Sequence, residues 1–425
     1  MKVYLDTIGC RLNQSEIEKM AAQFSAAGHE LVSDAAEADL VVVNTCAVTR
    51  EAASDSRQVI RRAARAGHAR VVATGCWATL DPQGAAALPA VTRVVKNDEK
   101  DALVASLLEM DEDCLAVETR QRLPGEHART RAFIKVQDGC NNACTFCITR
   151  VARGRSRSRS IEDVLKDVQQ AIAGDAREVV LSGVHLGSWG QDFETPLHLA
   201  RLIEAILART DVPRLRLSSL EPWDLDDAFF SLWSDKRLCP HLHLPLQSGS
   251  AAILKRMARK TTPDNYAALL DSAYRLIPDI AITTDLIVGF PGEGEAEFGE
   301  SLDFVRRMHF ATGHVFHFSP RPGTPAAHFA GQVAGPVSKQ RSAEMRALFG
   351  ELSENYRHAL INREMQVLWE TAKQQADGTW LLEGLSGNYV RVKAFDPQNL
   401  WNRISLVKLE TLTPEGMSGK IIRKL

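Results

Sequence analysis

Apolar and polar positions alternate in a regular way through the first quarter of the chain. Short apolar runs typical of buried β-strands lie at 3–5, 40–43 and 71–73. The stretches between them, such as 15–27 and 52–66, are typical of helices. Strands that alternate with helices pair in parallel, with helices on the faces of the sheet. The pattern therefore predicts an α/β fold that begins with an N-terminal doubly wound parallel sheet domain over residues 1–122.

This alternation is interrupted by the acidic segment 111–113 and by 121–131, which contains Pro and Gly, so we predict a linker and a boundary near residue 125. Beyond it, six strand candidates alternate with helices: 133–136, 178–181, 214–217, 241–244, 280–288 and 314–318. Six such units predict a central partial (β/α)6 barrel over residues 126–360. A helical run at 339–363 precedes short β-rich segments with Gly at the turns, which predict a small antiparallel β-barrel over residues 361–425.

Composition narrows the class of protein. A chain of 425 residues is long enough for two or three domains, each with its own core. Its 45% hydrophobic and 24% charged residues are those of an ordinary globular protein, which excludes a disordered chain. Lys and Arg (51) nearly balance Asp and Glu (53), so any site for a polyanion must be local.

The N-terminus has none of the three regions of a signal peptide, and no apolar run approaches the roughly 20 residues of a membrane span. We therefore expect a cytoplasmic protein without a membrane partner. Thiols stay reduced in that compartment, so the eight cysteines are expected to be metal ligands or buried side chains rather than disulfides.

Three cysteines share one short segment after the first strand of the central domain. Cys140, Cys144 and Cys147 lie in GCNNACTFC, a C-x3-C-x2-C spacing. A [4Fe-4S] cluster needs one ligand per iron, so three thiolates leave one iron open to another ligand. The alternatives are a zinc knuckle or buried free thiols, and the lack of a fourth Cys or His nearby disfavours zinc.

Three further cysteines are far apart in sequence but occupy equivalent places. Cys10, Cys46 and Cys76 each come directly after a predicted parallel strand. The carboxyl ends of neighbouring parallel strands meet at one crevice, so these thiols are expected to gather there and hold a second cluster. Each of these cysteines alone is better explained as a small buried side chain. Three cysteines at the same position after neighbouring strands, however, favour a cluster. Cys114 and Cys239 share none of these features and are interpreted as structural or incidental.

A series of motifs along nearly the whole chain resembles the methylthiotransferases of the radical S-adenosylmethionine superfamily. The motifs are TIGCRLNQSE (7–16), NTCAVT (44–49), TGC (74–76), QDGCNNACTFC (137–147), ARGRSRSRS (152–160), LSGVHLGSWG (181–190), HLHLPLQSGS (241–250) and TDLIVGFPGE (284–293). The first two and the QDGCN opening are most similar to the branch that modifies N6-threonylcarbamoyladenosine beside the tRNA anticodon. Thr149-Arg150 departs from the family, which commonly has a proline there.

This resemblance implies two [4Fe-4S] clusters and S-adenosylmethionine as cofactors. The catalytic Cys140, Cys144 and Cys147 would hold the radical-generating cluster, whose open iron binds S-adenosylmethionine and leads to a 5′-deoxyadenosyl radical. Cys10, Cys46 and Cys76 would hold an auxiliary cluster that carries the sulfur to be transferred. The implied product is the 2-methylthio derivative of the adenosine at position 37. Sister branches act on isopentenyladenosine in tRNA or on a ribosomal-protein aspartate, and a non-catalytic iron–sulfur RNA-binding regulator is a further alternative.

Candidate contacts to S-adenosylmethionine lie near the predicted strand ends, where barrel ligands bind. They are Gly183, Ser218, Glu221, Gln247, Arg259 and Gly289. Tight turns are the alternative explanation for the glycines, and solvated surface is the alternative for the charged residues.

Two features suggest contact with RNA. A basic run follows the cysteine loop, and it consists of Arg150, Arg153, Arg155, Arg157 and Arg159. Such a run is usually a solvated face, but its position also favours contact with phosphates or with the cofactor carboxylate. The last domain resembles the TRAM domain, a small β-barrel associated with RNA binding. The expected partners are the tRNA anticodon loop and a reductant protein such as flavodoxin or ferredoxin, and DNA is not expected.

Overall fold

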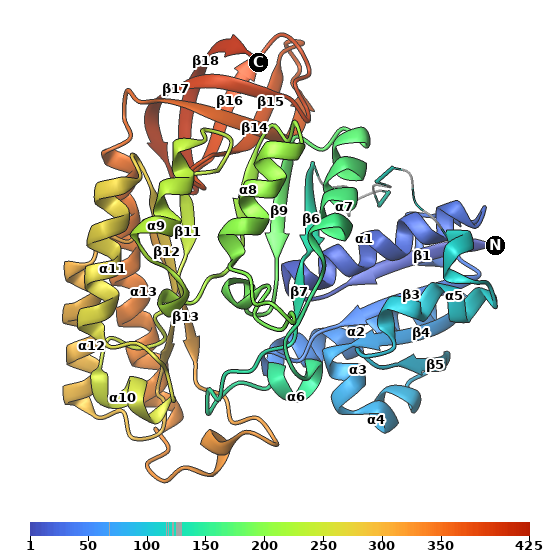
Figure 1. Ribbon diagram of the computed structural model, residues 1–425, viewed down its shortest axis with the longest axis horizontal. Coiled ribbons are helices and arrows are strands. Elements are labelled where there is room, and N and C mark those ends of the chain that lie inside the picture. The colour runs from blue at the N-terminus through green and yellow to red at the C-terminus, as the bar shows by residue number, and fades with distance from the viewer. Residues whose placement is uncertain (68, 116, 118, 121–122, 125–129) are drawn as a thin grey trace. The chain divides into compact units, whose positions relative to one another are not determined.

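The computed structural model describes residues 1–425 except 68, 116, 118, 121–122 and 125–129 (Figure 1). The chain forms two compact units. Unit 1 comprises Met1–Asn142, Cys147–Leu197 and Arg321–Gly323, and unit 2 comprises Ala143–Phe146, His198–Pro320 and Thr324–Leu425. The predicted boundary near residue 125 lies outside the described residues, and the three domain limits stay a prediction. In the part of the chain that the structure describes, no helix is both long enough and apolar enough to cross a membrane.

Unit 1 contains, within its described residues, a five-stranded sheet in the order β2-β1-β3-β4-β5. Its strands are β1 (Lys2–Thr7), β2 (Glu30–Leu31), β3 (Leu40–Thr45), β4 (Arg70–Gly75) and β5 (Val91–Val95), and every pairing is parallel. The predicted parallel sheet is confirmed, whereas β2 and β5 were not predicted. The strand order reverses between β1 and β3, and ligands of such sheets bind outside the carboxyl ends of the strands at that point.

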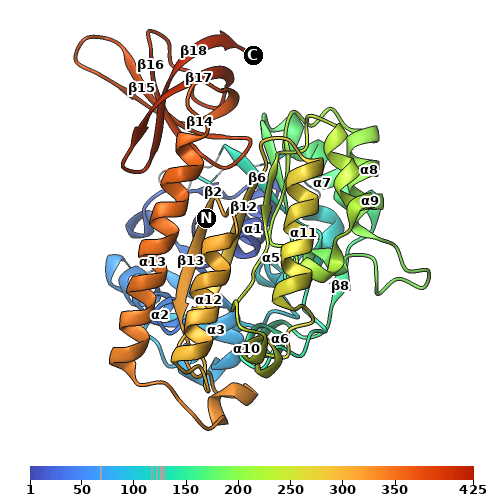
Figure 2. The same ribbon diagram turned by 90° about the vertical axis from the view of Figure 1, so that its left-hand side faces the viewer.

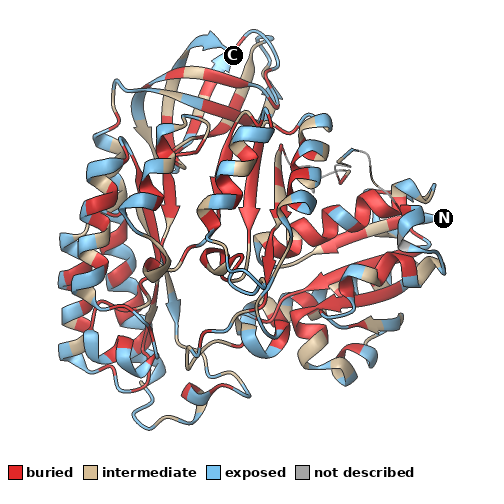
Figure 3. Cartoon of the chain, viewed as in Figure 1, coloured by how far each residue is buried: buried red, intermediate tan, exposed pale blue. Residues whose placement is uncertain are grey.

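Helices cover both faces of this sheet, which confirms the doubly wound fold. The helices are α1 (Arg11–Ala26), α2 (Arg50–Ala66), α3 (Cys76–Leu80), α4 (Pro82–Ala86) and α5 (Leu103–Leu108). Alternate side chains of β3 enter opposite cores: Val41 packs with Ile60 of α2, and Val42 packs with Phe24 of α1. Every residue of β3 is buried, as Figure 3 shows for the strand ribbons.

The rest of unit 1 carries the cysteine loop. Strand β6 (Arg131–Lys135) pairs in parallel with β9 (Glu178–Ser182), and α7 (Ile161–Ala173) lies between them in sequence. A short antiparallel pair, β7 (Gln137–Asp138) with β8 (Arg157–Ser158), brackets the loop, and α6 (Thr149–Arg153) lies inside it. The pair β7–β8 was not predicted.

Unit 2 contains the other four predicted strands of the central region. They are β10 (Leu215–Leu217), β11 (His241–His243), β12 (Ala281–Val288) and β13 (Thr312–His317), of which the last three pair in parallel. Its helices are α8 (Leu199–Arg209), α9 (Asp227–Phe230), α10 (Ala251–Arg256), α11 (Pro263–Leu276), α12 (Glu295–Arg307) and α13 (Gly335–His358). All six strands predicted for the central barrel are therefore present.

The end of the chain forms a closed barrel in the order β14-β15-β16-β18-β17 (Figure 2). Its strands are β14 (Glu364–Gln374), β15 (Trp380–Ser386), β16 (Arg391–Asp396), β17 (Ile404–Thr413) and β18 (Gly416–Lys424). The predicted barrel is confirmed, but β16 and β18 pair in parallel. Strand directions cannot alternate all the way round a ring of five, so one parallel pair is unavoidable.

Short 3₁₀ helices complete the described structure. They are η1 (Ala35–Glu37), η2 (Lys100–Ala102), η3 (Glu112–Leu115), η5 (Leu186–Ser188), η6 (Pro222–Asp224), η7 (Ser231–Ser234) and η8 (Pro325–His328).

Candidate functional site

The three strand-end cysteines follow three adjacent strands of the unit 1 sheet. Cys10 caps the N-terminus of α1 after β1, Cys46 follows β3, and Cys76 begins α3 after β4. Cys46 and Cys76 are only 3% and 4% exposed, whereas Cys10 is exposed. All three thus lie at the carboxyl edge of the sheet, next to the point where the strand order reverses.

These thiols are close enough to influence one another. A Cβ atom placed on Gly9 would lie 2.5 Å from the Sγ atom of Cys46, so the backbone before Cys10 approaches that sulfur directly. Burial, together with the neighbouring thiols of Cys10 and Cys76, raises the pKa of Cys46 to about 11. Among the described residues, no three Cys, His, Asp or Glu side chains converge on a single ion. A four-iron cluster does not require that, because each thiolate binds a different iron, and soft buried thiolates suit iron.

The second cysteine group begins at a tight turn. Gly139 has a φ of +71°, and a Cβ there would overlap the carbonyl oxygen of Arg155. The Cys140 amide donates to the carbonyl of Gly154 at 3.1 Å, and the Asn142 amide donates to the Cys140 sulfur at 3.4 Å. Cys140, Cys144 and Cys147 are each partly exposed. The loop therefore presents thiols to a ligand instead of burying them.

Within unit 2, a buried arginine lies beside Cys144. The Nη1 atom of Arg259 is 3.9 Å from the Cys144 sulfur, and its two terminal nitrogens bind both carboxylate oxygens of Glu221 at 3.0 and 2.6 Å. The Arg259 side chain is 1% exposed and lies 4.6 Å from the ring centroid of Trp223. The structure thus brings two predicted residues, Glu221 and Arg259, together next to a candidate cluster ligand.

The other predicted contact residues lie at or just beyond strand ends. Ser218 follows β10, and its buried hydroxyl has no hydrogen-bond partner within the described part of the chain. Gln247 has a φ of +73° and pairs through its backbone with Asp285 and Ile287 of β12. Gly289 follows β12 and donates to Glu293 at 2.8 Å, and Gly183 of unit 1 follows β9. These positions leave the predicted contacts to S-adenosylmethionine a prediction.

The basic run divides into different environments. Arg153 is buried, and its guanidinium binds Glu16, Asp138 and Asn13 at 2.7 to 3.1 Å. Arg159 pairs with Asp167 at 2.5 Å. Three members are exposed, namely Arg150, Arg155 and Arg157. Because Arg153 is 1% exposed, it is not available to phosphates.

Arg153 belongs to a buried charge network in unit 1, defined as Glu16, Lys100, Lys135, Asp138 and Arg153. The Nζ of Lys100 lies 2.8 Å from Glu16, and that of Lys135 lies 3.7 Å from Glu16 and 3.8 Å from Asp138. Burial alone would raise the pKa of Glu16, but the three surrounding cations outweigh it and hold this pKa well below its ordinary value. Sequence reasoning missed this network, although Asn13 and Glu16 lie within the first motif.

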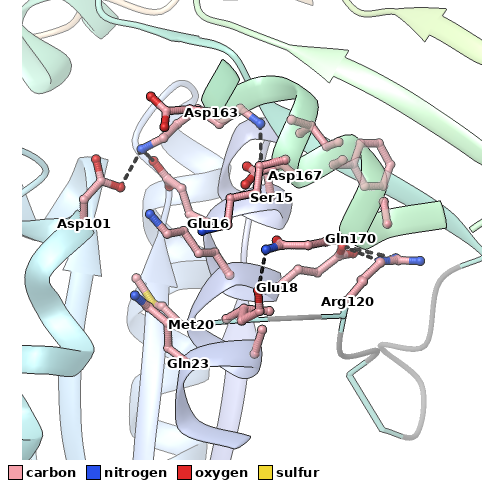
Figure 4. Close-up of a pocket in the computed structure, with 18 of the residues that line it drawn as sticks. Ser15, Glu16, Glu18, Met20, Gln23, Asp101, Arg120, Asp163, Asp167 and Gln170 are labelled. Carbon is pink, nitrogen blue, oxygen red and sulfur yellow. Dashed lines mark hydrogen bonds and ion pairs between the residues drawn. The ribbon is translucent and has the colours of Figure 1, made fainter. Parts of the chain in front are cut away.

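A cavity of about 480 Å³ lies between α1 and the segment formed by β6 and α7, all in unit 1. Figure 4 shows the charged and amide side chains around it, including Glu16, Glu18, Arg120 and Gln170. No cysteine lines this cavity among the described residues. It is therefore distinct from the candidate cluster sites.

Comparisons with known proteins agree with these features. Residues 2–96 match a family described as uncharacterized protein family UPF0004, and residues 134–305 match the radical SAM superfamily. Two relatives are named threonylcarbamoyladenosine tRNA methylthiotransferase. The protein of Bacillus subtilis is 36% identical over 96% of this chain and 93% of its own, and that of Thermotoga maritima is 35% identical over 98% and 96%. A Mycobacterium bovis relative, 34% identical over 87% of this chain and 77% of its own, is named tRNA-2-methylthio-N(6)-dimethylallyladenosine synthase.

A solved structure shares the fold. The radical S-adenosylmethionine methyltransferase TsrM from Kitasatospora setae matches with a TM-score of 0.58 at 15% identity, covering 77% of this chain and 75% of its own. This likeness confirms the predicted fold class of the central region. The near full-length relatives show that the chain belongs to the methylthiotransferase family of radical S-adenosylmethionine enzymes, whose cofactors are [4Fe-4S] clusters and S-adenosylmethionine.

Proposed function

We propose that this enzyme converts N6-threonylcarbamoyladenosine next to the tRNA anticodon, at position 37, to its 2-methylthio derivative. The observation that carries the proposal is the extent of the match. Relatives named for this substrate align over 93% and 96% of their own length, whereas the dimethylallyladenosine relative aligns over 77% of its own. The substrate is thus inferred from whole-length similarity, and the cofactor chemistry is inferred from the cysteines.

The two cysteine groups are the proposed cluster ligands. Cys140, Cys144 and Cys147 hold the catalytic cluster, which supplies the electron that cleaves S-adenosylmethionine to a radical able to attack an unactivated C–H bond. Cys10, Cys46 and Cys76 would hold the auxiliary cluster, which would supply the sulfur for transfer. The fit is supported by soft thiol donors at the carboxyl edge of a parallel sheet, where ligands of this fold bind.

Arg259 has a defined task in this proposal. Glu221 holds two of its nitrogens, which leaves its positive charge 3.9 Å from the Cys144 sulfur. The N–H group of Arg259 is thereby held where it can contact the Cys144 sulfur when that sulfur binds iron. Other chain atoms near the strand ends are proposed to bind S-adenosylmethionine, and these belong to Gly183, Ser218, Gln247 and Gly289.

The proposed partners are the tRNA anticodon loop and a reductant protein such as flavodoxin or ferredoxin, which work with this enzyme in the cytoplasm. Support for RNA contact comes from three exposed arginines that follow the cysteine loop, Arg150, Arg155 and Arg157. The C-terminal barrel adds exposed rings at Phe395 (65%) and Trp401 (38%), on which bases can stack. Trp369, by contrast, is fully buried and belongs to the barrel core.

The main alternative is the isopentenyladenosine substrate, which the Mycobacterium bovis relative favours by name. Mass spectrometry of nucleosides from tRNA separates the two. A strain without the gene should accumulate N6-threonylcarbamoyladenosine and lack its methylthio derivative, and the wild-type gene should restore it. A Cys140→Ala gene should not restore it, whereas Cys114→Ala should. Unchanged threonylcarbamoyladenosine species with altered isopentenyladenosine species would contradict the proposed substrate.

Iron analysis tests the ligands independently of the substrate. Replacing Cys10, Cys46 and Cys76 by Ala should remove about four irons per chain from the reconstituted enzyme, and replacing Cys140, Cys144 and Cys147 should remove about four others. The matched control is the pair Cys114→Ala and Cys239→Ala, which should keep all eight. Full iron content in either triple variant would refute that cluster assignment.

A further inference from the structure

The loop after β5 contributes a buried amide to the auxiliary cysteines. Asn97 is 7% exposed, and its Nδ2 donates to the Cys76 sulfur at 3.7 Å and to the carbonyl of Ala152 at 2.8 Å. Because a carbonyl can only accept, the second bond fixes which end of the amide faces Cys76. The Asn97 side chain therefore presents a donor to this sulfur.

The backbone of Asn97 is anchored to the same turn as Cys76. Its amide donates to the Thr79 hydroxyl at 2.9 Å, and that hydroxyl donates to the Gly75 carbonyl at 2.8 Å. Gly75 and Thr79 flank Cys76 at the start of α3. The donor is thus held in place relative to the sulfur on both its backbone and its side chain.

Packing alone does not account for an asparagine here. The Asn97 Oδ1 atom is buried and has no hydrogen-bond partner among the described residues. An unsatisfied buried oxygen is unfavourable, and an apolar side chain of similar size would avoid it. A polar group kept at such a position calls for an explanation, and the two hydrogen bonds of its amide nitrogen, to the Ala152 carbonyl and to the Cys76 sulfur, provide one.

The second bond of the amide reaches the helix that ends the other cysteine loop. Ala152 and Arg153 lie at the end of α6, which begins two residues after Cys147. Arg153 binds Asn13, whose Oδ1 lies 3.7 Å from the Cys10 sulfur. Helix α6 therefore binds both Asn97, which contacts Cys76, and Asn13, which contacts Cys10.

We propose that Asn97 is a positioning residue of the auxiliary cluster, and that its N–H···S contact with Cys76 raises the reduction potential of that cluster. This inference rests on the proposed cluster assignment. Hydrogen bonds to cluster sulfurs are among the factors that set these potentials. A donor stabilises the reduced cluster because reduction adds negative charge that the donor offsets.

The test uses the full-length chain with Cys140, Cys144 and Cys147 changed to Ala, so that only the auxiliary cluster is measured. Into this chain are placed Asn97→Leu, which removes the donor, and Asn97→Asp, which also adds negative charge. Asp98→Asn is the matched control, because it changes a charge at the exposed neighbouring residue. Iron content and an anaerobic dithionite titration followed by electron paramagnetic resonance are recorded for each chain.

We expect about four irons per chain in every variant and a lower potential in both Asn97 variants, lower in Asn97→Asp than in Asn97→Leu. A tenfold change in the reduction equilibrium corresponds to about 59 mV for one electron. Absence of iron from the parent triple variant would overturn the cluster assignment itself. If the parent triple variant contains iron, an unchanged reduction potential in the Asn97 variants would overturn the proposal that Asn97 raises this potential. If only one of the two Asn97 variants loses iron, the potential of the other variant decides. If both lose iron, the role of Asn97 is purely structural, and the proposed effect on the reduction potential is overturned.

Discussion

The buried charge network of unit 1 allows a test of how Arg153 acts. The change is Arg153→Met, which keeps much of the side-chain volume and removes the charge. Arg153 and Glu16 are 1% and 3% exposed, and their closest atoms lie 2.9 Å apart. Solvent therefore screens this pair very little, and the remaining carboxylates would stay buried after the change.

The expected cost follows from what remains around the carboxylates. Removing one partner of a buried ion pair costs about 3–5 kcal/mol. Lys100 stays 2.8 Å from Glu16, and Lys135 stays 3.8 Å from Asp138. We therefore expect the lower end, about 3 kcal/mol, for Arg153→Met. Glu16→Gln should lower the free energy of unfolding by a similar amount, because it leaves Arg153 and Lys100 without their shared carboxylate.

A double-mutant cycle separates the ion pair from general packing. The variant with both Arg153→Met and Glu16→Gln restores the balance of charge. Its loss of free energy of unfolding should therefore be smaller than the sum of the two single losses by about 2 kcal/mol. The measurement is hydrogen–deuterium exchange of α1 peptides from the cluster-free chain across a urea series. Arg155→Met, at an exposed site of the same run, is the control and should change stability by less than about 0.5 kcal/mol. If the double variant lost as much free energy of unfolding as the two single variants together, the inference that Arg153 and Glu16 stabilise the fold as an ion pair would be refuted.

Three other predictions follow from the same geometry. The pKa of Glu16 is held below its ordinary value of 4.5, so the contribution of this residue to stability is present above pH 4.5 and is lost as the pH falls. The free energy of unfolding should therefore fall less steeply with decreasing pH in Glu16→Gln than in the wild type. Equal slopes in the two proteins would contradict this. Gly139→Ala should abolish iron binding at the loop of Cys140 because its Cβ overlaps a carbonyl, whereas Gly350→Ala, in α13 with open space around its Cβ and no positive φ, should retain iron; equal iron contents would contradict this. Changing the exposed Arg155 or Arg157 to Ala should reduce the salt dependence of tRNA binding by about one counterion each without affecting stability, and an unchanged salt slope would exclude phosphate contact.

Long buried segments were the part of the fold that the sequence predicted well. Strands β1, β3 and β4 have continuous apolar runs, and helices separate them, so their parallel pairing follows from pattern alone. Strand β5 was missed because Thr92 and Arg93 are exposed at the edge of the sheet. Strands β7 and β8 have two residues each, which is too short for any periodicity.

For the candidate site, the sequence pointed to the cysteines and to Glu221 and Arg259 beside Cys144, but not to the buried residues around the strand-end cysteines. Cys140, Cys144 and Cys147 are close in sequence, and Cys10, Cys46 and Cys76 are marked by strand ends. The contacts of Arg153 with Glu16 and of Asn97 with Ala152 span 137 and 55 positions. Pairing over such separations depends on the tertiary fold, and no local pattern specifies it.

The division of the basic run has a local cause. In an extended segment, arginines at every second position would lie on one face, which would give Arg153, Arg155 and Arg157 one environment. Gly154 instead ends α6 with a φ of +74°, so Arg153 belongs to a helix and Arg157 to β8. The helical turn directs Arg153 to Glu16 on α1, while the chain beyond the glycine leaves Arg155 and Arg157 exposed. The positive φ of Gly154 therefore separates the buried structural Arg153 from the exposed Arg155 and Arg157.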